Sequence, residues 1–196
     1  MTRTNHEAST HQATAHQATA HEANTHQVNT HDTDTRPAMS LDPDTFRAAL
    51  GRFATGVTIV TALGADGNDY GMTVSAFSSV SLVPPLVLVC VGHEASIYDV
   101  LMQASHFAVN VLSAGQEALA RRFAETGAQR FAGIGYSRGE RGMAVLHDVL
   151  AHVECRRVAT HEAGDHTVIV GETENAVVRE GRPLLYYRGG YAQLER

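Results

Sequence analysis

The chain has 196 residues, a formal net charge of −6 and 43% hydrophobic residues, and all fifteen of its basic residues are arginines. This length favours a single domain with a core of ordinary size. The arginines form no basic stripe and no apolar run approaches the roughly 18 residues of a membrane span, so the sequence argues against nucleic-acid binding and against membrane insertion. Cys90 and Cys155 belong to no C-x-x-C pair and the N-terminus lacks a signal-peptide core, which favours a reducing cytoplasm.

Residues 1–38 form a segment of different composition from the rest. Within it a five-residue unit repeats six times, and each unit begins with a histidine: His6, His11, His16, His21, His26 and His31. A period of five makes no apolar face on a helix or a strand, so we predict a disordered tail followed by a domain over 39–196. Spaced histidines on a flexible chain offer weak binding of zinc, nickel or copper, and Met39 is an alternative start of the protein.

The first elements of the domain are predicted to be one helix and three strands. Asp42 is expected to cap a helix that ends near Gly56. Its apolar side chains have helical spacing and are expected to face inward: Phe46, Ala49, Leu50 and Phe53. Strands are predicted over 57–63, 70–81 and 86–91, with an Asp-Gly hairpin turn at 65–68 between the first two.

The remainder of the chain is predicted to consist mostly of strands. A short helix is expected over 96–103, a strand over 107–112 and a helix over 116–125. Strands are then expected over about 151–159, 166–178 and 184–191. Many strands, few helices and little β-α-β alternation predict a mainly β, barrel-like antiparallel body.

The stretch 71–86, Gly-Met-Thr-Val-Ser-Ala-Phe-Ser-Ser-Val-Ser-Leu-Val-Pro-Pro-Leu, is rich in hydroxyls, and the two prolines at 84 and 85 interrupt its strand pattern. In a continuous strand, alternation places one set of side chains on the same side: Thr73, Ser75, Phe77, Ser79 and Ser81. Hydroxyls beside backbone N–H groups can hold a phosphate without a lysine. The same pattern also fits an edge strand with a solvated Ser/Thr face.

Residues 73–86 resemble the flavin-contacting strand and loop of the flavin reductase family, the small NAD(P)H:flavin oxidoreductases that serve two-component monooxygenases. Similar blocks occur in the family's order at 46–61, 107–112, 122–123, 131–133, 164–166 and 183–191. The resemblance covers about residues 42–194. It implies a split β-barrel of the FMN-binding type, a homodimer whose subunits share each flavin site, and an oxygenase component as partner.

The resemblance also implies the cofactors and the residues that contact them. The cofactors are FMN or FAD together with NADH or NADPH. The implied cofactor-binding positions are Tyr70, Gly71, Met72, Thr73, Ser75, Ala76, Cys90, Val91, Gly92, Ser96, Arg122, Phe123, Tyr186, Tyr187, Arg188 and Gly189. The implied catalytic residue is His166, within Gly164-Asp165-His166.

Some of these positions have an alternative structural interpretation. Arg122 carries a permanent charge in a planar fork suited to phosphate, but a solvated helix arginine fits the same sequence. His166 would hydrogen-bond the incoming dinucleotide, whereas a lone histidine is often structural. Cys90 is described equally well as a small buried apolar residue. His161 and Glu162 lie near Asp165, but their spacing matches no metal site.

The expected reaction is hydride transfer from nicotinamide to flavin, which needs a flavin bed, a phosphate anchor and room for the nicotinamide. It requires neither a nucleophile nor a metal, and the domain shows no motif for either. Two alternatives on the same scaffold are a flavin-binding electron carrier and an enzyme like pyridoxamine-phosphate oxidase.

Overall fold

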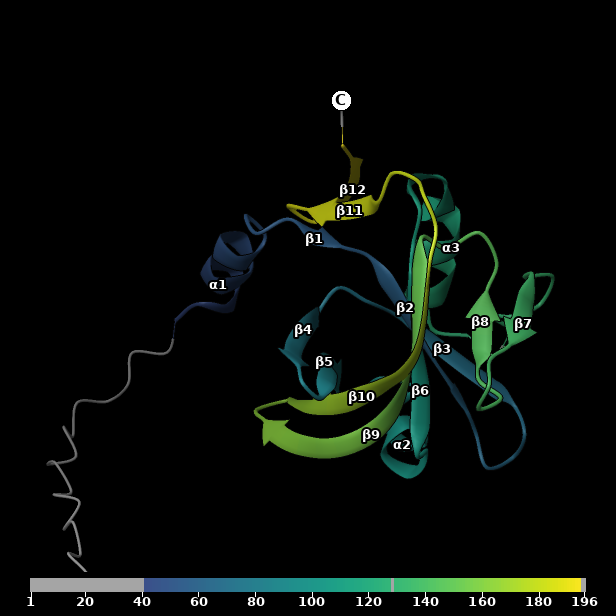
Figure 1. Ribbon diagram of the computed structural model, residues 1–196. Coiled ribbons are helices and arrows are strands. Elements are labelled where there is room, and N and C mark those ends of the chain that lie inside the picture. Colours follow the sequence, from purple (N-terminus) through teal and green to yellow (C-terminus); the bar gives the residue numbers. More distant parts are fainter. Residues whose placement is uncertain (1–40, 128, 195–196) are drawn as a thin grey trace, which may run out of the picture. The chain divides into compact units, whose positions relative to one another are not determined.

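The computed structural model describes residues 41–127 and 129–194, which contain a seven-stranded antiparallel sheet of order β3-β2-β6-β9-β10-β5-β4 (Figure 1). Its strands are β2 (Thr58–Leu63), β3 (Asp69–Val74), β4 (Phe77–Leu82), β5 (Pro85–Gly92), β6 (His106–Val111), β9 (Ala151–Ala163) and β10 (His166–Val178). This arrangement confirms the predicted mainly β, antiparallel class.

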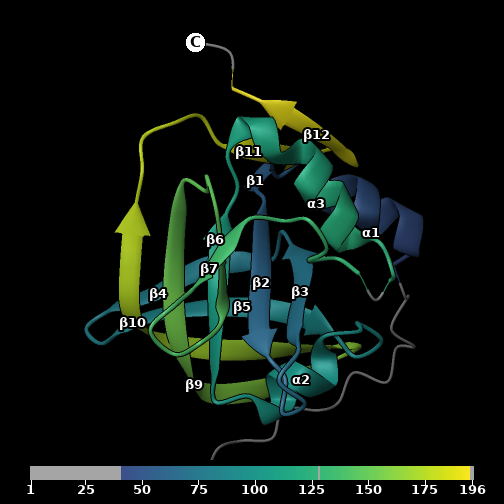
Figure 2. The same ribbon diagram turned by 90° about the vertical axis from the view of Figure 1, so that its right-hand side faces the viewer.

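Two small sheets and four short helices complete the described part of the chain. One small sheet contains β1 (Thr55–Gly56), β11 (Leu184–Tyr187) and β12 (Gly190–Gln193), and the other contains β7 (Tyr136–Arg138) and β8 (Ala144–Leu146). The helices are α1 (Pro43–Leu50), α2 (Tyr98–Gln103), the 3-10 helix η1 (Ala114–Gln116) and α3 (Glu117–Ala124). Figure 2 shows α2 at one end of β2 and β3 and α3 at the other.

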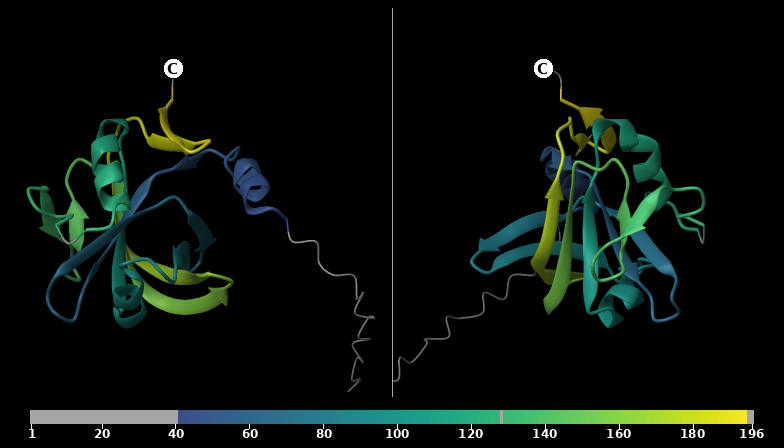
Figure 3. Two further views of the ribbon diagram at one scale, coloured as in Figure 1. Left: turned by 180° about the vertical axis from the view of Figure 1, so that it is seen from behind. Right: turned by 45° about the vertical axis from the view of Figure 1, so that its right-hand side comes forward.

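The main sheet curls because β9 and β10 bend along their length. The first half of β9 pairs with β6, and the first half of β10 pairs with β5. Between these regions the β9–β10 register shifts near Gly171 and again near Asn175, and such bulges bend a strand. A Cβ atom at Gly171 would lie 2.5 Å from Cζ of Phe107, so only glycine fits at the bend. Figure 3 shows the curl from two further sides.

Two hydrophobic clusters lie on opposite sides of β2, because neighbouring side chains of a strand alternate between faces. Val60 belongs to the cluster that also contains Val89 and Phe107. Ile59 belongs to the second cluster, in which Phe123 of α3 is fully buried. The curl of the sheet and the packing of α3 therefore position β3, which lies next to β2 at one edge.

The predicted inward packing of α1 is wrong. Asp42 caps the helix as expected, and its side chain accepts a hydrogen bond from the backbone N–H of Thr45, but the helix ends at Leu50. No residue of α1 is buried, and Phe46 and Phe53 remain 54% and 75% exposed. Figure 1 shows α1 away from the strands of the main sheet. The apolar stripe exists, but nothing in the described chain covers it.

The strand predicted over 70–81 is two strands, β3 and β4, with a break at Ser75 and Ala76. These strands lie at opposite edges of the main sheet. The side-chain alternation expected across 73–81 therefore does not hold, because it requires one continuous strand. The strand predicted over 184–191 is likewise interrupted, by a turn at Arg188 and Gly189 between β11 and β12.

Within residues 41–127 and 129–194, no helix is long and apolar enough to cross a membrane. The predicted tail, its histidine repeat and the alternative start at Met39 lie outside the described residues.

Candidate functional site

A cavity of about 680 Å³ lies beside β3, an edge strand of the main sheet. Three segments that are distant in the sequence line it: β3, the turn after β5, and the loop after α3. The lining residues are Asn68, Asp69, Tyr70, Gly71, Ser96, Ile97, Gly127, Gln129, Arg130, Phe131 and Ala132. The cavity therefore brings together three of the predicted cofactor-binding positions, Tyr70, Gly71 and Ser96.

Gly71 allows the loop after α3 to approach β3 closely. A Cβ atom at this position would lie 2.7 Å from Cε1 of Phe123 and 3.1 Å from Cζ of Phe131. The two phenylalanine rings pack edge to face, with centroids 5.0 Å apart. A side chain at position 71 would push these rings away and change the wall of the cavity.

A second cavity of about 210 Å³ lies beside the break between β3 and β4. Its lining residues are Val57, Thr73, Ser75, Ala124, Tyr186 and Tyr191. Thr73 donates its hydroxyl hydrogen to the carbonyl oxygen of Ala120 on α3, at 2.7 Å. The Ser75 side chain is exposed, and the rings of Tyr186 and Tyr191 pack edge to face at 5.4 Å. The predicted positions Thr73, Ser75 and Tyr186 thus share one small cavity.

Arg122 holds the loop after α3 through the loop's backbone. Its Nη2 donates to the carbonyl oxygens of Gln129, at 2.9 Å, and of Ala132, at 2.5 Å. Arg122 also lines a third cavity of about 170 Å³, together with Arg130. Arg122 therefore stabilises the loop after α3 and also lines a cavity.

The prediction from sequence missed Arg130, which lines both the 680 Å³ and the 170 Å³ cavities. Its Nη1 donates to the carbonyl oxygen of Gly71 at 2.6 Å, and its Nη2 donates to that of Glu125. Burial lowers the pKa of the guanidinium, which nevertheless stays charged. The available signal was its place directly before the block Phe131-Ala132-Gly133.

Cys90, Val91 and Gly92 end β5, where Val91 is buried in the first hydrophobic cluster and Cys90 is half-buried. The backbone N–H of Cys90 donates to the carbonyl oxygen of Ala76 at 3.0 Å, which ties the break after β3 to β5. Burial raises the pKa of the Cys90 thiol, so the side chain is neutral at pH 7. Cys90 thus behaves as a small half-buried residue.

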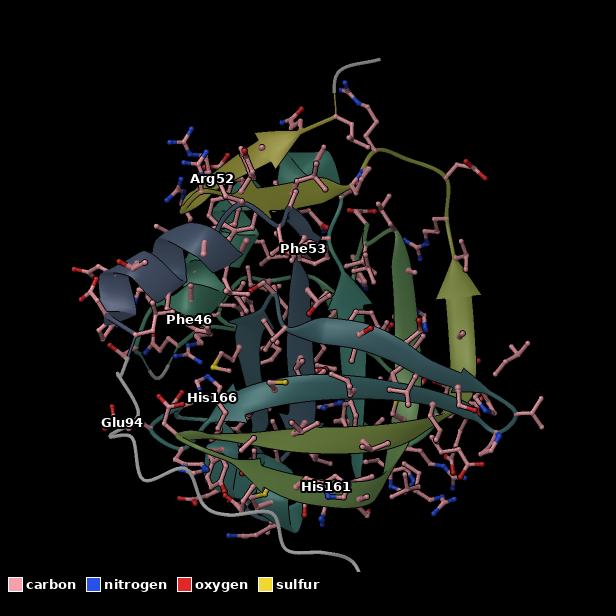
Figure 4. All side chains as sticks on the ribbon, turned by 90° about the vertical axis from the view of Figure 1, so that its left-hand side faces the viewer. Phe46, Arg52, Phe53, Glu94, His161 and His166 are labelled. Atoms are coloured by element: carbon pink, nitrogen blue, oxygen red, sulfur yellow. The ribbon has the colours of Figure 1, made fainter. Side chains whose placement is uncertain are left out.

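His166 begins β10 and pairs in register with Gly92 of β5. A Cβ atom at Gly92 would lie 3.5 Å from Nε2 of His166, so the imidazole lies against the glycine. Its Nδ1 lies 2.7 Å from Oδ1 of Asp165, and this contact lowers the pKa of the Asp165 carboxyl. Figure 4 shows His166 and Glu94 at the same end of the sheet, while His161 lies further along β9.

The remaining predicted positions line none of these three cavities. Met72 packs against the first core cluster and the Phe123 side chain lies inside the second. Tyr187, Arg188 and Gly189 form the exposed β11–β12 turn, in which Arg188 and Gly189 have φ of 50° and 79°. The backbone N–H of Arg188 donates to the carbonyl oxygen of Gly51 at 2.9 Å. Within one described chain, the turn therefore contacts the segment after α1.

Comparison with known proteins gives consistent matches over the domain. The FMN reductase (NADH) SmoA of Agrobacterium fabrum is 45% identical over 152 residues, which cover 78% of this chain and 86% of SmoA. The reductase subunit HsaB of a flavin-dependent monooxygenase of Rhodococcus jostii is 38% identical and is matched over 81% of both chains.

A solved structure agrees in fold as well as in sequence. The NADH:FAD oxidoreductase SgcE6 of Streptomyces globisporus, in complex with NAD and FAD fragments, superposes with a TM-score of 0.75 at 38% identity. The match covers 79% of this chain and 96% of that one. The family described as "Flavin reductase like domain" matches residues 50–195. The chain therefore belongs to the flavin reductase-like family.

Proposed function

We propose that this protein is an NADH:flavin oxidoreductase that reduces FMN or FAD and supplies the reduced flavin to a partner monooxygenase. The observation that carries this proposal is the convergence of β3, the turn after β5 and the loop after α3 on one cavity, in a chain of this family. NADH and both flavins appear in the names of its relatives, SmoA and SgcE6. The name of HsaB supports the oxygenase partner.

The residues around the larger cavity fit a flavin. Its volume of about 680 Å³ lies in the usual range for cofactor sites, roughly 300–1,000 Å³. β3 is an edge strand, so backbone groups along one side lack a strand partner and can meet a polar ligand. Arg122 and Arg130 add positive charge near this wall, which suits a phosphate.

His166 is the residue that we propose to hydrogen-bond the nicotinamide dinucleotide. A flavin bound at this site would supply N5 as the acceptor of the hydride from C4 of the reduced nicotinamide. The chain contributes orientation, which brings two reactants together in a reactive geometry. Gly92 leaves room for the His166 ring, and its Nδ1 faces Oδ1 of Asp165, so Nε2 is the nitrogen directed away from Asp165.

We also propose a homodimer in which the exposed stripe of α1 packs on a second copy of the chain. The stripe consists of Phe46 and Leu50 on α1 and of Phe53 three residues after its end, and each of these side chains is more than half exposed. Leu82 and Val83, in the β4–β5 turn, are also exposed and apolar. Burial of such side chains is worth about 1.5–3 kcal/mol each, which favours a covered surface.

We further propose that the fold is a split β-barrel and that the protein is cytoplasmic. The free thiols of Cys90 and Cys155 support the cytoplasmic location, because a reducing compartment keeps thiols unpaired.

The first experiment is to measure NADH and NADPH oxidation by the full chain in air, with FMN or FAD added in turn. We expect rapid NADH oxidation that depends on added flavin, since flavin takes the hydride from NADH and is then reoxidised as it passes two electrons to oxygen. Tight flavin binding without NADH oxidation would instead support the electron-carrier alternative.

His166→Ala tests the assigned residue. We expect flavin reduction by NADH, measured by anaerobic stopped-flow, to slow about tenfold or more, with the flavin dissociation constant changed less than about twofold. His161→Ala is the matched control, because His161 is an exposed histidine of β9. Equal losses of reduction rate and flavin affinity in His166→Ala would contradict this role.

A further inference from the structure

A hydrogen-bonded group of four side chains connects the turn after β5 to the β9–β10 hairpin. The group consists of His93, Tyr98, Glu162 and Thr167, and we call it the Thr167 network. Thr167 is fully buried, whereas the side chains of His93 and Glu162 are 37% and 70% exposed. Glu162 lies on β9, Thr167 on β10, Tyr98 at the start of α2 and His93 in the turn before it.

The hydrogen bonds of the network have a consistent direction. The Thr167 hydroxyl donates to Oε1 of Glu162 at 3.1 Å. Because that hydroxyl has one hydrogen, the Tyr98 hydroxyl, 3.0 Å away, donates to Thr167 Oγ1. Nε2 of His93 lies 3.0 Å from Oε2 of Glu162 and 3.3 Å from Thr167 Oγ1, so its hydrogen goes to the carboxylate. Thr167 is therefore the centre of the network.

The network joins the two sides of the proposed site. The turn that carries His93 continues to Ser96, which lines the 680 Å³ cavity. Thr167 follows His166 directly on β10. The backbone N–H of His93 also donates to the carbonyl oxygen of Asp165 at 3.0 Å, and the His93 and Tyr98 rings pack edge to face at 5.1 Å. A shift of either turn would therefore move Ser96 and His166 relative to each other.

The Asp165 contact cannot by itself hold His166 in place. The Asp165 side chain is 95% exposed, and exposed ion pairs contribute little to conformational order. The position of the imidazole then depends on the backbone of β10, which Thr167 anchors from its buried side.

We propose that the Thr167 network is a positioning device that sets His166 against the flavin-binding turn, with Thr167 and Tyr98 as its positioning residues. This inference rests on the proposed function, because it gives the network a role only if His166 meets the nicotinamide. Neither residue touches the reacting atoms. Their hydroxyls act through the placement of His166.

The test uses Thr167→Val, which keeps the shape of the side chain and removes its hydroxyl, in the full chain. We expect flavin reduction at saturating NADH to slow about five- to twentyfold, with flavin affinity changed less than about twofold. Thr160→Val is the matched control, since Thr160 is an exposed threonine of β9, and it should reduce flavin at the wild-type rate.

A double-mutant cycle separates positioning from a general structural effect. If Thr167 acts through His166, Thr167→Val should slow reduction less than about twofold in a His166→Ala background. An equal slowing in both backgrounds, or a parallel loss of flavin affinity, would overturn the proposal. Tyr98→Phe removes one hydroxyl of the network and leaves Thr167 unchanged. It therefore tests the proposal even if the Thr167→Val protein does not fold. It should slow reduction about two- to fivefold and show the same dependence on His166.

The wild-type protein separates this inference from the proposed function. A wild type that fails to oxidise NADH with any flavin contradicts the function itself. A wild type that oxidises NADH, with Thr167→Val and Tyr98→Phe at full rate, contradicts only the role of the network.

Discussion

Single residues at this site act mainly through the space they leave or the groups they hold. Gly71 and Gly92 leave room, the first for Phe123 and the second for the His166 ring. Arg122 and Arg130 hold backbone carbonyls of the loop after α3 and of β3. Flavin reduction requires orientation rather than a nucleophile, so such residues are the ones on which the rate should depend.

The two thiols should differ in reactivity. Cys155 is fully buried, and burial raises the pKa of its thiol to about 11, while Cys90 is half-buried with a pKa raised by the same cause. We expect a thiol reagent such as DTNB to leave Cys155 unmodified in the native protein and to modify both residues after unfolding. Rapid modification of two thiols in the native protein would contradict this prediction.

The same pKa shift gives stability a dependence on pH. Cys155 has an ordinary pKa of about 9 when unfolded, and its folded value of about 11 is higher. The neutral thiol is therefore favoured in the fold, and its contribution to stability is complete below pH 9 and is lost as the pH rises toward 11. The melting temperature of Cys155→Ala should fall less steeply between pH 9 and pH 11 than that of the wild type, as measured by thermal denaturation. An equally steep fall in both proteins would contradict this prediction.

At the scale of elements, buried polar side chains join the β7–β8 hairpin to the main sheet. Thr61 of β2 donates its hydroxyl hydrogen to the carbonyl oxygen of Ala144 at 2.6 Å. Asn110 of β6 donates to the carbonyl oxygen of Ile59 at 3.0 Å and accepts from the backbone N–H of Leu146 at 2.9 Å. Both side chains are fully buried, so each lost bond leaves an unsatisfied polar group.

Thr61→Val should therefore destabilise the protein by about 1–3 kcal/mol, because Ala144 loses its hydrogen-bond donor in the interior. Denaturant unfolding measures this free energy. Thr160→Val again serves as the control, and as an exposed substitution it should change stability by less than about 0.5 kcal/mol. Equal stability of the two variants would show that the buried hydroxyl contributes nothing.

At the scale of the whole molecule, the described part of the chain leaves the apolar side of α1 exposed. α1 is amphipathic but none of its residues is buried. In the proposed homodimer, a second copy of the chain would bury the stripe and the two subunits would share each flavin site. Folding, assembly and flavin binding are then linked in one equilibrium.

Phe46→Ser combined with Phe53→Ser should shift the protein from dimer to monomer in light scattering, because the variant removes most of the exposed apolar area of the stripe. Flavin affinity should fall with it. Arg52→Ser is the matched control, since Arg52 is an exposed residue next to Phe53 and is labelled with it in Figure 4. A wild type with the mass of one chain would refute the dimer.

Deletion of residues 1–38 should leave NADH oxidation unchanged, because every residue assigned to the site lies between positions 57 and 191. Steady-state rates of the full chain and of the shortened chain, each with added flavin, measure this. A large loss of turnover would give the histidine repeat a role in the reaction.

Local patterns in the sequence determined most of the elements. Interactions between residues close in sequence determine three features that were predicted: the Asp42 cap, the Asp-Gly turn before β3 and the strand over 166–178. The order of the blocks also determined the family. The predictions failed where a local pattern has two outcomes: the apolar stripe of α1 fits either a core or a partner, and 70–81 fits either one strand or two.

Only the tertiary structure decided which residues meet. Thr167 and Tyr98 are 69 residues apart in sequence, and their hydroxyls form one network because β10 pairs beside β5 and α2 follows β5. Arg130 reaches Gly71 because α3 packs on β3 and directs the loop after it to that edge. Such contacts arise from strand pairing and helix packing between distant segments, and no local spacing encodes them.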